Sequence, residues 1–440
     1  MRPLYFLLKY LLKLPLWIYY PRFLNVNKPK KRFARTIFAS NHAASFMDPL
    51  VIAQTQPPIV FFMTRSDVFK PFLKPILWAS HMFPIYREID GTDTKSKNEA
   101  VFRKCYRVLK YGRSLIIFSE GFTDDIFIRR LKPIKKGAIR IGFGALEYTN
   151  WEKKIYIRAV GVNYSNPNSI GSDVVISNSD PICLNDYRQQ YEEDSNKTIY
   201  ELTKHVEIKM REQLTDVRNA SWAPTHEHIM RLTRKGMNAV DTDKSIPLLK
   251  RWEYSKSLAS WINEQDLDNN SRLIELKKKL KDYFDLLNNE KLEEQHIYKM
   301  SNQKWSKAKD LMYFILLAPI MVVGLIHNYL PYIFIKKFVE KAFRRKVFWG
   351  SVKMMLGIVA IGLFNIPFIF LGYYLLCPSW LFWIGYSLTV APLSGIVAYG
   401  YFKKLKAYRV MVKASKRNLS HIYSQRKALI NEIHELIPVA

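Results

Sequence analysis

The sequence predicts an α/β domain with an enclosed sheet, followed by a helical region that enters a membrane. Three observations lead to this prediction. Short apolar runs alternate with helical stretches between residues 34 and 179, which is typical of a sheet covered by helices. Long uncharged runs occupy the last third of the chain. The formal net charge of +30 gathers beside those runs, as expected for a protein held at an anionic lipid surface.

The first expected element is an apolar N-terminal helix within residues 1–30. Residues 1–20 are mostly leucine, tyrosine, tryptophan, phenylalanine and isoleucine. Lys9 and Lys13 lie one helical turn apart and form a polar stripe, and Pro15 is expected to kink or end the helix. This pattern predicts an interfacial or shallowly inserted membrane anchor. A signal peptide is disfavoured by the charges within the run and by the lack of a small-residue cleavage site.

Residues 31–190 are predicted to form the α/β domain, with a sheet flanked by helices. Strands are expected at Thr36–Ser40, Ile59–Met63, Met82–Tyr86, Ser114–Phe118, Ile155–Val162 and Val174–Ile176. Helices are expected between them at Val68–Ala79, Lys97–Tyr111 and Lys136–Glu147. Residues 191–310 are polar, charged and predicted to be mostly helical.

Residues 311–405 contain three predicted membrane segments. Residues 354–376 and 380–401 are expected to form a helical hairpin, and basic residues at both ends place those ends in the cytoplasm by the positive-inside rule. The segment 311–335 is either re-entrant or spanning; basic residues on both of its flanks favour a re-entrant or interfacial segment. Residues 406–440 are predicted to form a basic helix at the cytoplasmic surface.

Charge and cysteine content limit the partners and the compartment. A basic chain could bind nucleic acid, but its basic residues flank hydrophobic spans and no nucleic-acid-binding motif is present. We therefore expect membrane lipid and no nucleic acid as partner. Cys105, Cys183 and Cys377 are far apart, without a metal-ligand or paired pattern. This favours a reducing compartment, with the α/β domain on the cytoplasmic face of a membrane.

The clearest chemical signal is the stretch Asn41-His42-Ala43-Ala44-Ser45-Phe46-Met47-Asp48-Pro49. The imidazole of His42 is suited to take a proton near neutral pH, and the Asp48 carboxylate can hold its other ring nitrogen. The two residues are six positions apart, so they can meet only where a loop enters a helix. Asp48-Pro49 is typical of such a helix start. No serine or cysteine stands out as a nucleophile, so the base would activate a hydroxyl of the substrate.

Four further features follow in order beyond this loop. Phe83-Pro84-Ile85-Tyr86-Arg87 and Phe118-Ser119-Glu120-Gly121-Phe122-Thr123 each end an expected strand, and Leu131-Lys132-Pro133-Ile134-Lys135-Lys136-Gly137-Ala138 opens an expected helix. The last is the expected strand Ala159-Val160-Gly161-Val162-Asn163-Tyr164. Residues just past strand ends line the ligand crevice of an open α/β sheet. A base, a carboxylate, an arginine and lysines at such ends predict a site for an anionic acceptor that carries a hydroxyl.

This order of motifs resembles the glycerophospholipid acyltransferase family, the PlsC-like group of lysophosphatidate and glycerol-3-phosphate acyltransferases, over about residues 30–180. The resemblance implies that His42 is the general base and that Asp48 orients it. It implies acceptor binding by Arg87, Glu120, Gly121, Thr123 and Lys135. Arg87 and Lys135 would contact the phosphate, while the Glu-Gly block would line the acceptor site.

Alternatives stay open for several of these residues. Arg87 could instead pair with Glu88 or Asp90 on the surface, and Lys132 or Lys136 could take the place of Lys135. Glu120 could be an ordinary strand-end carboxylate. His81 and His327 are expected to be structural, although Asn328 could mark a functional polar spot in the membrane.

Two departures from the family pattern bear on the acceptor. Five residues separate His42 from Asp48, where the commoner family spacing is four, and this longer loop resembles the branch that includes fungal glycerol-3-phosphate acyltransferases and some bacterial relatives. Ser119 also replaces the usual proline before Glu120.

The resemblance implies an O-acyltransferase that moves a fatty acyl group from acyl-CoA or acyl carrier protein to a lysophospholipid, with 1-acylglycerol-3-phosphate as the expected acceptor. No metal or redox cofactor is expected. Glycerol-3-phosphate, dihydroxyacetone phosphate or an amino-acid-based lysolipid are alternative acceptors. A non-catalytic lipid-binding membrane scaffold is the alternative from another class.

Overall fold

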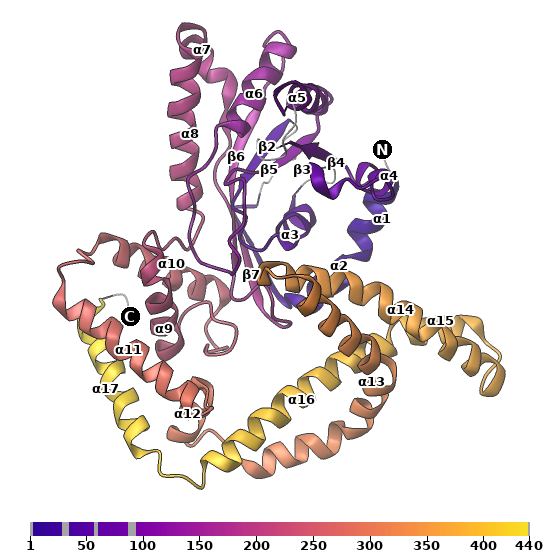
Figure 1. Cartoon of the computed structure of the whole chain (residues 1–440), viewed down its shortest axis with the longest axis vertical. Coiled ribbons are helices and arrows are strands. Elements are labelled where there is room, and N and C mark those ends of the chain that lie inside the picture. Colours follow the sequence, from indigo (N-terminus) through magenta and orange to yellow (C-terminus); the bar gives the residue numbers. More distant parts are fainter. Residues whose placement is uncertain (1–2, 29–34, 57–59, 87–93, 439–440) are drawn as a thin grey trace. The chain divides into compact units, whose positions relative to one another are not determined.

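The computed structural model describes residues 3–28, 35–56, 60–86 and 94–438, and Figure 1 shows its elements. The chain divides into two compact units. The sheet unit comprises Met1–Ala223 and Lys244–Glu264, and the helical unit comprises Pro224–Asp243 and Gln265–Ala440. The predicted polar helical region 191–310 is therefore divided between both units.

Among its described residues, the sheet unit has eight strands in the order β1-β7-β6-β2-β5-β3-β4, with β8 paired to β6. The strands are β1 (Arg22–Val26), β2 (Thr36–Ser40), β3 (Val60–Arg65), β4 (Met82–Ile85), β5 (Ser114–Phe118), β6 (Tyr156–Tyr164), β7 (Asp173–Asn178) and β8 (Ile182–Cys183). Strands β2 to β6 run parallel, whereas β7 and β8 run antiparallel to β6. The predicted fold class, an α/β sheet flanked by helices, is confirmed.

Helices cover the sheet because the strands are apolar on both faces. The helices and 3₁₀ turns of this unit are α3 (Met47–Thr55), η1 (Ser66–Val68), α4 (Lys74–Ala79), α5 (Thr94–Lys110), α6 (Gly137–Tyr148), η3 (Leu184–Tyr187), α7 (Arg188–Glu193), α8 (Ser195–Arg211), η4 (Ala220–Trp222) and α10 (Leu248–Glu264). The main core lies between α5, α6 and α8 and the sheet face that presents Ile37, Leu115 and Ile157. Packing of this core against the sheet holds the strands, and with them the strand ends where the candidate site lies.

Two short helices, α1 (Pro3–Leu11) and α2 (Lys13–Tyr19), precede the sheet. They are interrupted at Leu12 because Pro15 has no N–H to donate to the carbonyl of residue 11. One face packs on the unit: the Val60 amide donates to the Tyr5 hydroxyl (3.3 Å), and Gln54 of α3 donates to the Lys9 carbonyl (2.6 Å). The other face leaves Leu7, Tyr10, Leu11, Leu14 and Trp17 exposed.

The helical unit contains α9 (Ala223–Thr233), α11 (Ser271–Asn289), α12 (Glu294–Ser301), α13 (Lys307–Ala342), η5 (Lys346–Phe348), α14 (Trp349–Leu375), α15 (Trp380–Leu388), α16 (Val390–Ala414) and α17 (Ser420–Leu436). Within the described residues, three helical segments are long and apolar enough to cross a membrane: Lys307–Ala342, Lys346–Leu375 and Trp380–Ala414. The predicted segment 311–335 is part of one continuous helix, in spite of Pro319 and Pro331.

Candidate active site

The candidate site lies at the carboxyl ends of three neighbouring parallel strands. In the sheet register, Ser40 at the end of β2 is paired with Phe118 of β5 on one side and with Val160 of β6 on the other. Residues that directly follow these positions therefore meet at one edge of the sheet. His42 follows β2, Glu120 follows β5, and Tyr164 is the last residue of β6.

The loop after β2 brings His42 and Asp48 together, as predicted. The Met47 amide donates to the Ala44 carbonyl and the Asp48 amide to the Ser45 carbonyl, and Ser45 adopts a left-handed backbone conformation with φ +53°. This turn leads directly into α3, whose first turn carries Asp48. The Nδ1 atom of His42 lies 2.9 Å from Oδ2 of Asp48.

The Asp48 carboxylate is fully buried and is held by three groups. Its Oδ2 accepts a hydrogen bond from the Ala44 amide (2.8 Å) in addition to its contact with His42, and its Oδ1 accepts one from the Tyr164 hydroxyl (2.8 Å). Burial and the neighbouring Asp48 charge raise the pKa of Tyr164 well above its usual value. Tyr164 therefore stays protonated and remains a donor, which stabilises a carboxylate that would otherwise be costly to bury.

His42 presents its second ring nitrogen away from this carboxylate. Its ring stacks on Phe118, with the centroids 4.1 Å apart, and its side chain is 22% exposed. Within the described part of the chain, no group forms a hydrogen bond to Nε2. With Asp48 accepting from Nδ1–H, Nε2 is the ring position that can take a proton from a bound hydroxyl.

Glu120 holds the loop in place from the next strand. Its Oε1 accepts a hydrogen bond from the His42 amide (2.8 Å), and its Oε2 lies 3.2 Å from Nζ of Lys132. Glu120 and Lys132 are both buried. Burial raises the pKa of Glu120, and the Lys132 charge opposes this rise. The carboxylate predicted to line the acceptor site is thus already engaged by the loop that carries His42 and by Lys132.

The remaining residues of the Glu-Gly block form a tight turn. Gly121 has φ +78°, which favours glycine, and a Cβ atom there would come within 3.0 Å of the Lys135 side chain. The Lys135 amide donates to the Ser119 carbonyl (2.8 Å), and its side chain is exposed beside Gly121. Thr123 is buried in the same turn region. Lys135 is therefore open to solvent, whereas Lys132 is buried.

Arg87 lies outside the described residues. Strand β4 ends two residues before it, at Ile85. The intervening Tyr86 is anchored on both sides of its backbone, because Asn98 of α5 accepts from its amide (3.0 Å) and donates to its carbonyl (2.8 Å). The acceptor-phosphate role of Arg87 stays a prediction.

Two residues of the site, Asn41 and Tyr164, were given no role from the sequence, and Lys132 was given only as an alternative to Lys135. Asn41 ties the loop to β6, because its side chain accepts from the Val162 amide (2.8 Å) and donates to the Val162 carbonyl (3.1 Å). Tyr164 supports Asp48, and Lys132 supports Glu120. A polar residue directly after a buried strand was the available signal for Asn41. For Tyr164 the only signal was its place at the end of a predicted strand.

The site has the parts of a general base on a rigid support, and no covalent nucleophile lies in hydrogen-bond contact with His42 among the described residues. In the same part of the chain, no group of three histidine, cysteine, aspartate or glutamate side chains is placed to hold a metal ion. The arrangement can deprotonate a hydroxyl supplied by a ligand.

Part of the chain is similar to known proteins. Residues 24–162 match the family model described as Acyltransferase, and this match confirms the resemblance to an acyltransferase family that the motifs indicated. Among solved structures, the crystal structure of the 1-acyl-sn-glycerophosphate (LPA) acyltransferase PlsC from Thermotoga maritima is similar at 17% identity, with a TM-score of 0.28, over 43% of this chain and 72% of that chain. No curated protein matches this chain.

Proposed function

We propose that this acyltransferase domain transfers a fatty acyl group from a thioester donor to the free hydroxyl of 1-acylglycerol-3-phosphate, giving phosphatidate. The observation that carries the proposal is the His42–Asp48 pair, in which a buried carboxylate holds one ring nitrogen and leaves the other to a ligand. The thioester of acyl-CoA or acyl carrier protein supplies its own leaving group. The proposed reaction therefore requires no metal or redox cofactor.

In the proposed mechanism His42 acts as general base. Its Nε2 removes the proton from the acceptor hydroxyl as the hydroxyl oxygen attacks the thioester carbonyl, and Asp48 stabilises the imidazolium that forms. The tetrahedral oxyanion then collapses, the carbon–sulfur bond breaks, and the thiolate leaves with the proton from His42. General acid–base catalysis of this kind contributes about 100- to 10,000-fold.

The acceptor phosphate is assigned to cationic side chains near the catalytic loop. Lys135 is exposed next to Gly121, and Lys132 is already neutralised by Glu120 and Asp124. We therefore assign a phosphate contact to Lys135 and retain Arg87 as the second. Glu120, Gly121 and Thr123 are proposed to shape this end of the acceptor site.

The apolar surfaces of both units favour an acceptor that resides in a membrane. In the sheet unit, the exposed face of α1 and α2 carries large apolar side chains, including Trp17 at 57% exposure. Among the described residues of the helical unit, three helical segments are long and apolar enough to cross a bilayer. We propose that the N-terminal helices lie in the interface and that the active site works on the cytoplasmic face, where basic residues accumulate.

The test is acyl transfer by the detergent-purified full chain from radiolabelled palmitoyl-CoA or oleoyl-CoA. Lysophosphatidate and glycerol-3-phosphate are offered in parallel, and the series is repeated with acyl carrier protein as donor. We expect product from lysophosphatidate. Product from glycerol-3-phosphate alone would assign the enzyme to the preceding acylation, and no product with any acceptor or donor would contradict the proposed activity.

The mechanism is tested in the same assay with His42→Ala. We expect kcat to fall by about 100- to 10,000-fold, while the protein still folds and associates with membranes. His205→Ala is the matched control, because His205 is exposed on α8. A His42→Ala variant that keeps more than a few per cent of the wild-type rate would rule out the general-base role.

A further inference from the structure

The apolar region of the helical unit runs from α13 to the first half of α16. The polar segments that precede and follow this region contact one another. Lys279 of α11 pairs with Glu432 of α17 (3.1 Å), and the buried Glu294 of α12 pairs with Arg426 of α17 (2.6 Å). At the boundary of the apolar region, Asp310 near the start of α13 pairs with Lys404 of α16 (3.0 Å). The segment that precedes the apolar region thus lies beside the segment that follows it.

This packing limits how the apolar region can be threaded through a bilayer. Charged helices such as α11, α12 and α17 cannot lie in the hydrocarbon core, so they share one side of the membrane, here called the near side. A chain that leaves and returns to the same side makes an even number of complete crossings. Since three segments are long and apolar enough to cross, at least one of them does not.

Three pairs of helix segments meet around His327 and Asn328 of α13. The first half of α13 packs on α16, where a Cβ atom on Gly324 would lie 2.2 Å from the Ser394 carbonyl oxygen. The second half of α13 packs on α14, and Glu340 pairs with Lys353 (2.7 Å). Beyond this junction, the end of α14 pairs with α15. In Figure 1 the course of α13 bends between its two halves.

Polar side chains hold the three pairs together at this junction. The Nε2 atom of His327 lies 3.0 Å from the Tyr386 hydroxyl, and its Nδ1 contacts the Asn365 side chain. Asn328 donates to the Ala391 carbonyl (2.8 Å). Hydrogen bonds of this kind between helices stabilise packing in an apolar environment.

The distribution of charge shows which helices cross. The end of α13, the connection that follows it and the start of α14 are strongly basic, with Lys336, Lys337, Lys341, Arg344, Arg345, Lys346 and Lys353. By contrast, residues 354–402 contain no Asp, Glu, Lys or Arg, and this range includes the turn between α14 and α15. An uncharged turn is the less costly one to move across a bilayer, and the basic connection belongs on the cytoplasmic side.

We propose that α13 is a re-entrant helix, and that the helical unit crosses the bilayer only twice, through α14 and through the return leg formed by α15 and the first half of α16. The turn at residues 376–379 then lies on the far side. Both ends of α13 and the end of α16 lie on the near side with the polar helices.

Helix lengths agree with this arrangement. From Lys353 to Asn365 is twelve residues, or about 18 Å of helix, and from Lys403 back to Ala391 is also twelve residues. Both routes place the junction at about half of the roughly 30 Å hydrocarbon core. A further ten residues of α14, about 15 Å, reach its end at Leu375. The neighbouring Tyr373 ring stacks on Trp380 with centroids 4.0 Å apart, and such aromatic pairs are typical of a membrane interface.

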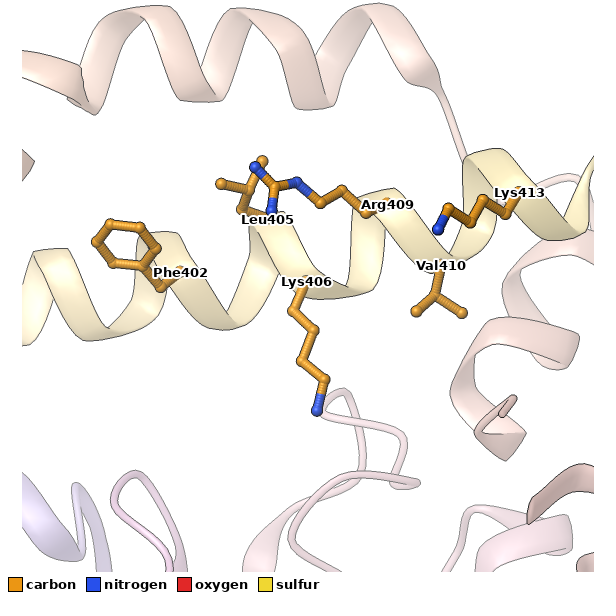
Figure 2. Close-up of a pocket in the computed structure, with 6 residues that line it drawn as sticks. All are labelled: Phe402, Leu405, Lys406, Arg409, Val410 and Lys413. Atoms are coloured by element: carbon orange, nitrogen blue, oxygen red, sulfur yellow. The ribbon is translucent and has the colours of Figure 1, made fainter. Parts of the chain in front are cut away.

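The near side also carries a cationic hollow where α16 leaves the proposed bilayer. Figure 2 shows that its lining residues all come from this helix. The hollow has a volume of about 280 Å³ and is lined by Phe402, Leu405, Lys406, Arg409, Val410 and Lys413. Alternating apolar and cationic groups at this level fit the acyl-chain boundary and the anionic headgroups of one leaflet.

The proposal is tested by labelling single cysteines in the full chain with a membrane-impermeant maleimide, in spheroplasts and in inverted membrane vesicles of a bacterial host. The native Cys377 is exposed at the turn between α14 and α15 and needs no substitution. The other probes are the exposed positions Asn302→Cys, Lys346→Cys and Asn418→Cys, each with Cys377→Ser. All variants carry Cys183→Ser, and the buried Cys105 is retained.

We expect residues 302, 346 and 418 to be labelled only in inverted vesicles and Cys377 only in spheroplasts. Labelling of residue 346 from the same side as Cys377 would overturn the re-entrant assignment of α13. Labelling of residues 302 and 418 from opposite sides would overturn the even number of crossings. Cys377 labelled in inverted vesicles, or only after detergent is added, would show that the hairpin does not cross.

Discussion

Each unit contains a histidine that lies among polar partners, and the two histidines differ in how their ring nitrogens are engaged. His42 has Nδ1 on the buried Asp48 carboxylate and no hydrogen-bond partner on Nε2 among the described residues. His327 has both nitrogens engaged, by Asn365 and by Tyr386. A histidine with one nitrogen held by a carboxylate is equipped to exchange a proton with a ligand. A histidine with two neutral partners is equipped to join helices.

The largest expected effect follows from changing the partner that distinguishes His42. In Asp48→Asn, an amide replaces the carboxylate, the imidazolium is no longer stabilised, and the NH₂ group favours the wrong tautomer. We expect kcat to fall by about 1,000- to 10,000-fold, as for other histidine–aspartate pairs, measured by the acyl-transfer assay. Activity within tenfold of wild type would show that His42 does not depend on this carboxylate.

The support beneath His42 can be tested through Lys132. Lys132→Met leaves Glu120 buried without its cation, which costs about 3–5 kcal/mol in the free energy of unfolding, measured by chemical denaturation. Lys135→Met is the matched control: its side chain is exposed, so stability should stay within about 0.5 kcal/mol. Equal losses in the two variants would contradict a structural role specific to Lys132.

The loss of stability in Lys132→Met depends on pH, and the direction of this dependence follows from the pKa of Glu120. Burial raises the pKa of Glu120 in the folded protein above its unfolded value, so protonation at low pH favours the folded state. Without Lys132 the pKa of Glu120 rises further. We therefore expect the stability difference between Lys132→Met and wild type to shrink as the pH falls through the raised pKa, and to grow again as the pH rises through it.

A smaller effect is expected at Tyr164. Tyr164→Phe removes the hydroxyl that hydrogen bonds to Asp48, and we expect kcat to fall about tenfold, equivalent to about 1.4 kcal/mol. The remaining carboxylate charge is less dispersed and holds the imidazolium more tightly. The acid limb of the profile of kcat/KM against pH should therefore move to higher pH.

Tyr20→Phe is the control for Tyr164→Phe. Tyr20 is equally buried and its ring packs 5.4 Å from that of Tyr164, but its hydroxyl donates to the Pro167 carbonyl. Its pH profile should match wild type. The same shift in both variants would assign the effect to packing and not to the hydrogen bond on Asp48.

The smallest expected effect concerns the second histidine. Asn365→Ala removes one partner of His327, and we expect a loss of about 1 kcal/mol in the stability of the helical unit, with kcat within twofold of wild type. Stability is measured by thermal unfolding in detergent. A large loss of turnover without a loss of stability would give His327 a functional role and remove the contrast with His42.

The sequence predicts most reliably what depends on neighbouring residues. Strands β2 and β5 occupy the predicted ranges because both are continuous apolar runs. The loop that joins His42 to Asp48 was also predictable, since a loop entering a helix is the local geometry in which they meet. The expected structural nature of His327 agrees with its two hydrogen bonds.

What depends on the sheet register could not be predicted from local pattern. Strand β1 was missed because Arg22 and Asn25 make it polar, and it pairs in parallel with β7, about 150 residues away. The support of Asp48 by Tyr164 arises only when β6 pairs with β2. Glu120 was expected to line the acceptor site, but its carboxylate contacts the His42 amide and Lys132, which no sequence spacing shows.

The order in which these contacts form along the folding pathway follows from their separation in the chain. His42 and Asp48 are six residues apart, so a short loop suffices to close their contact, whereas the contact of Asp48 with Tyr164 spans 116 residues and that of His42 with Glu120 spans 78. Long loops close late because of their entropy cost. The contact between His42 and Asp48 can therefore form early, whereas the contacts with Tyr164 and Glu120 form only when the sheet is complete. Recovery of turnover is therefore expected late in the folding of this chain.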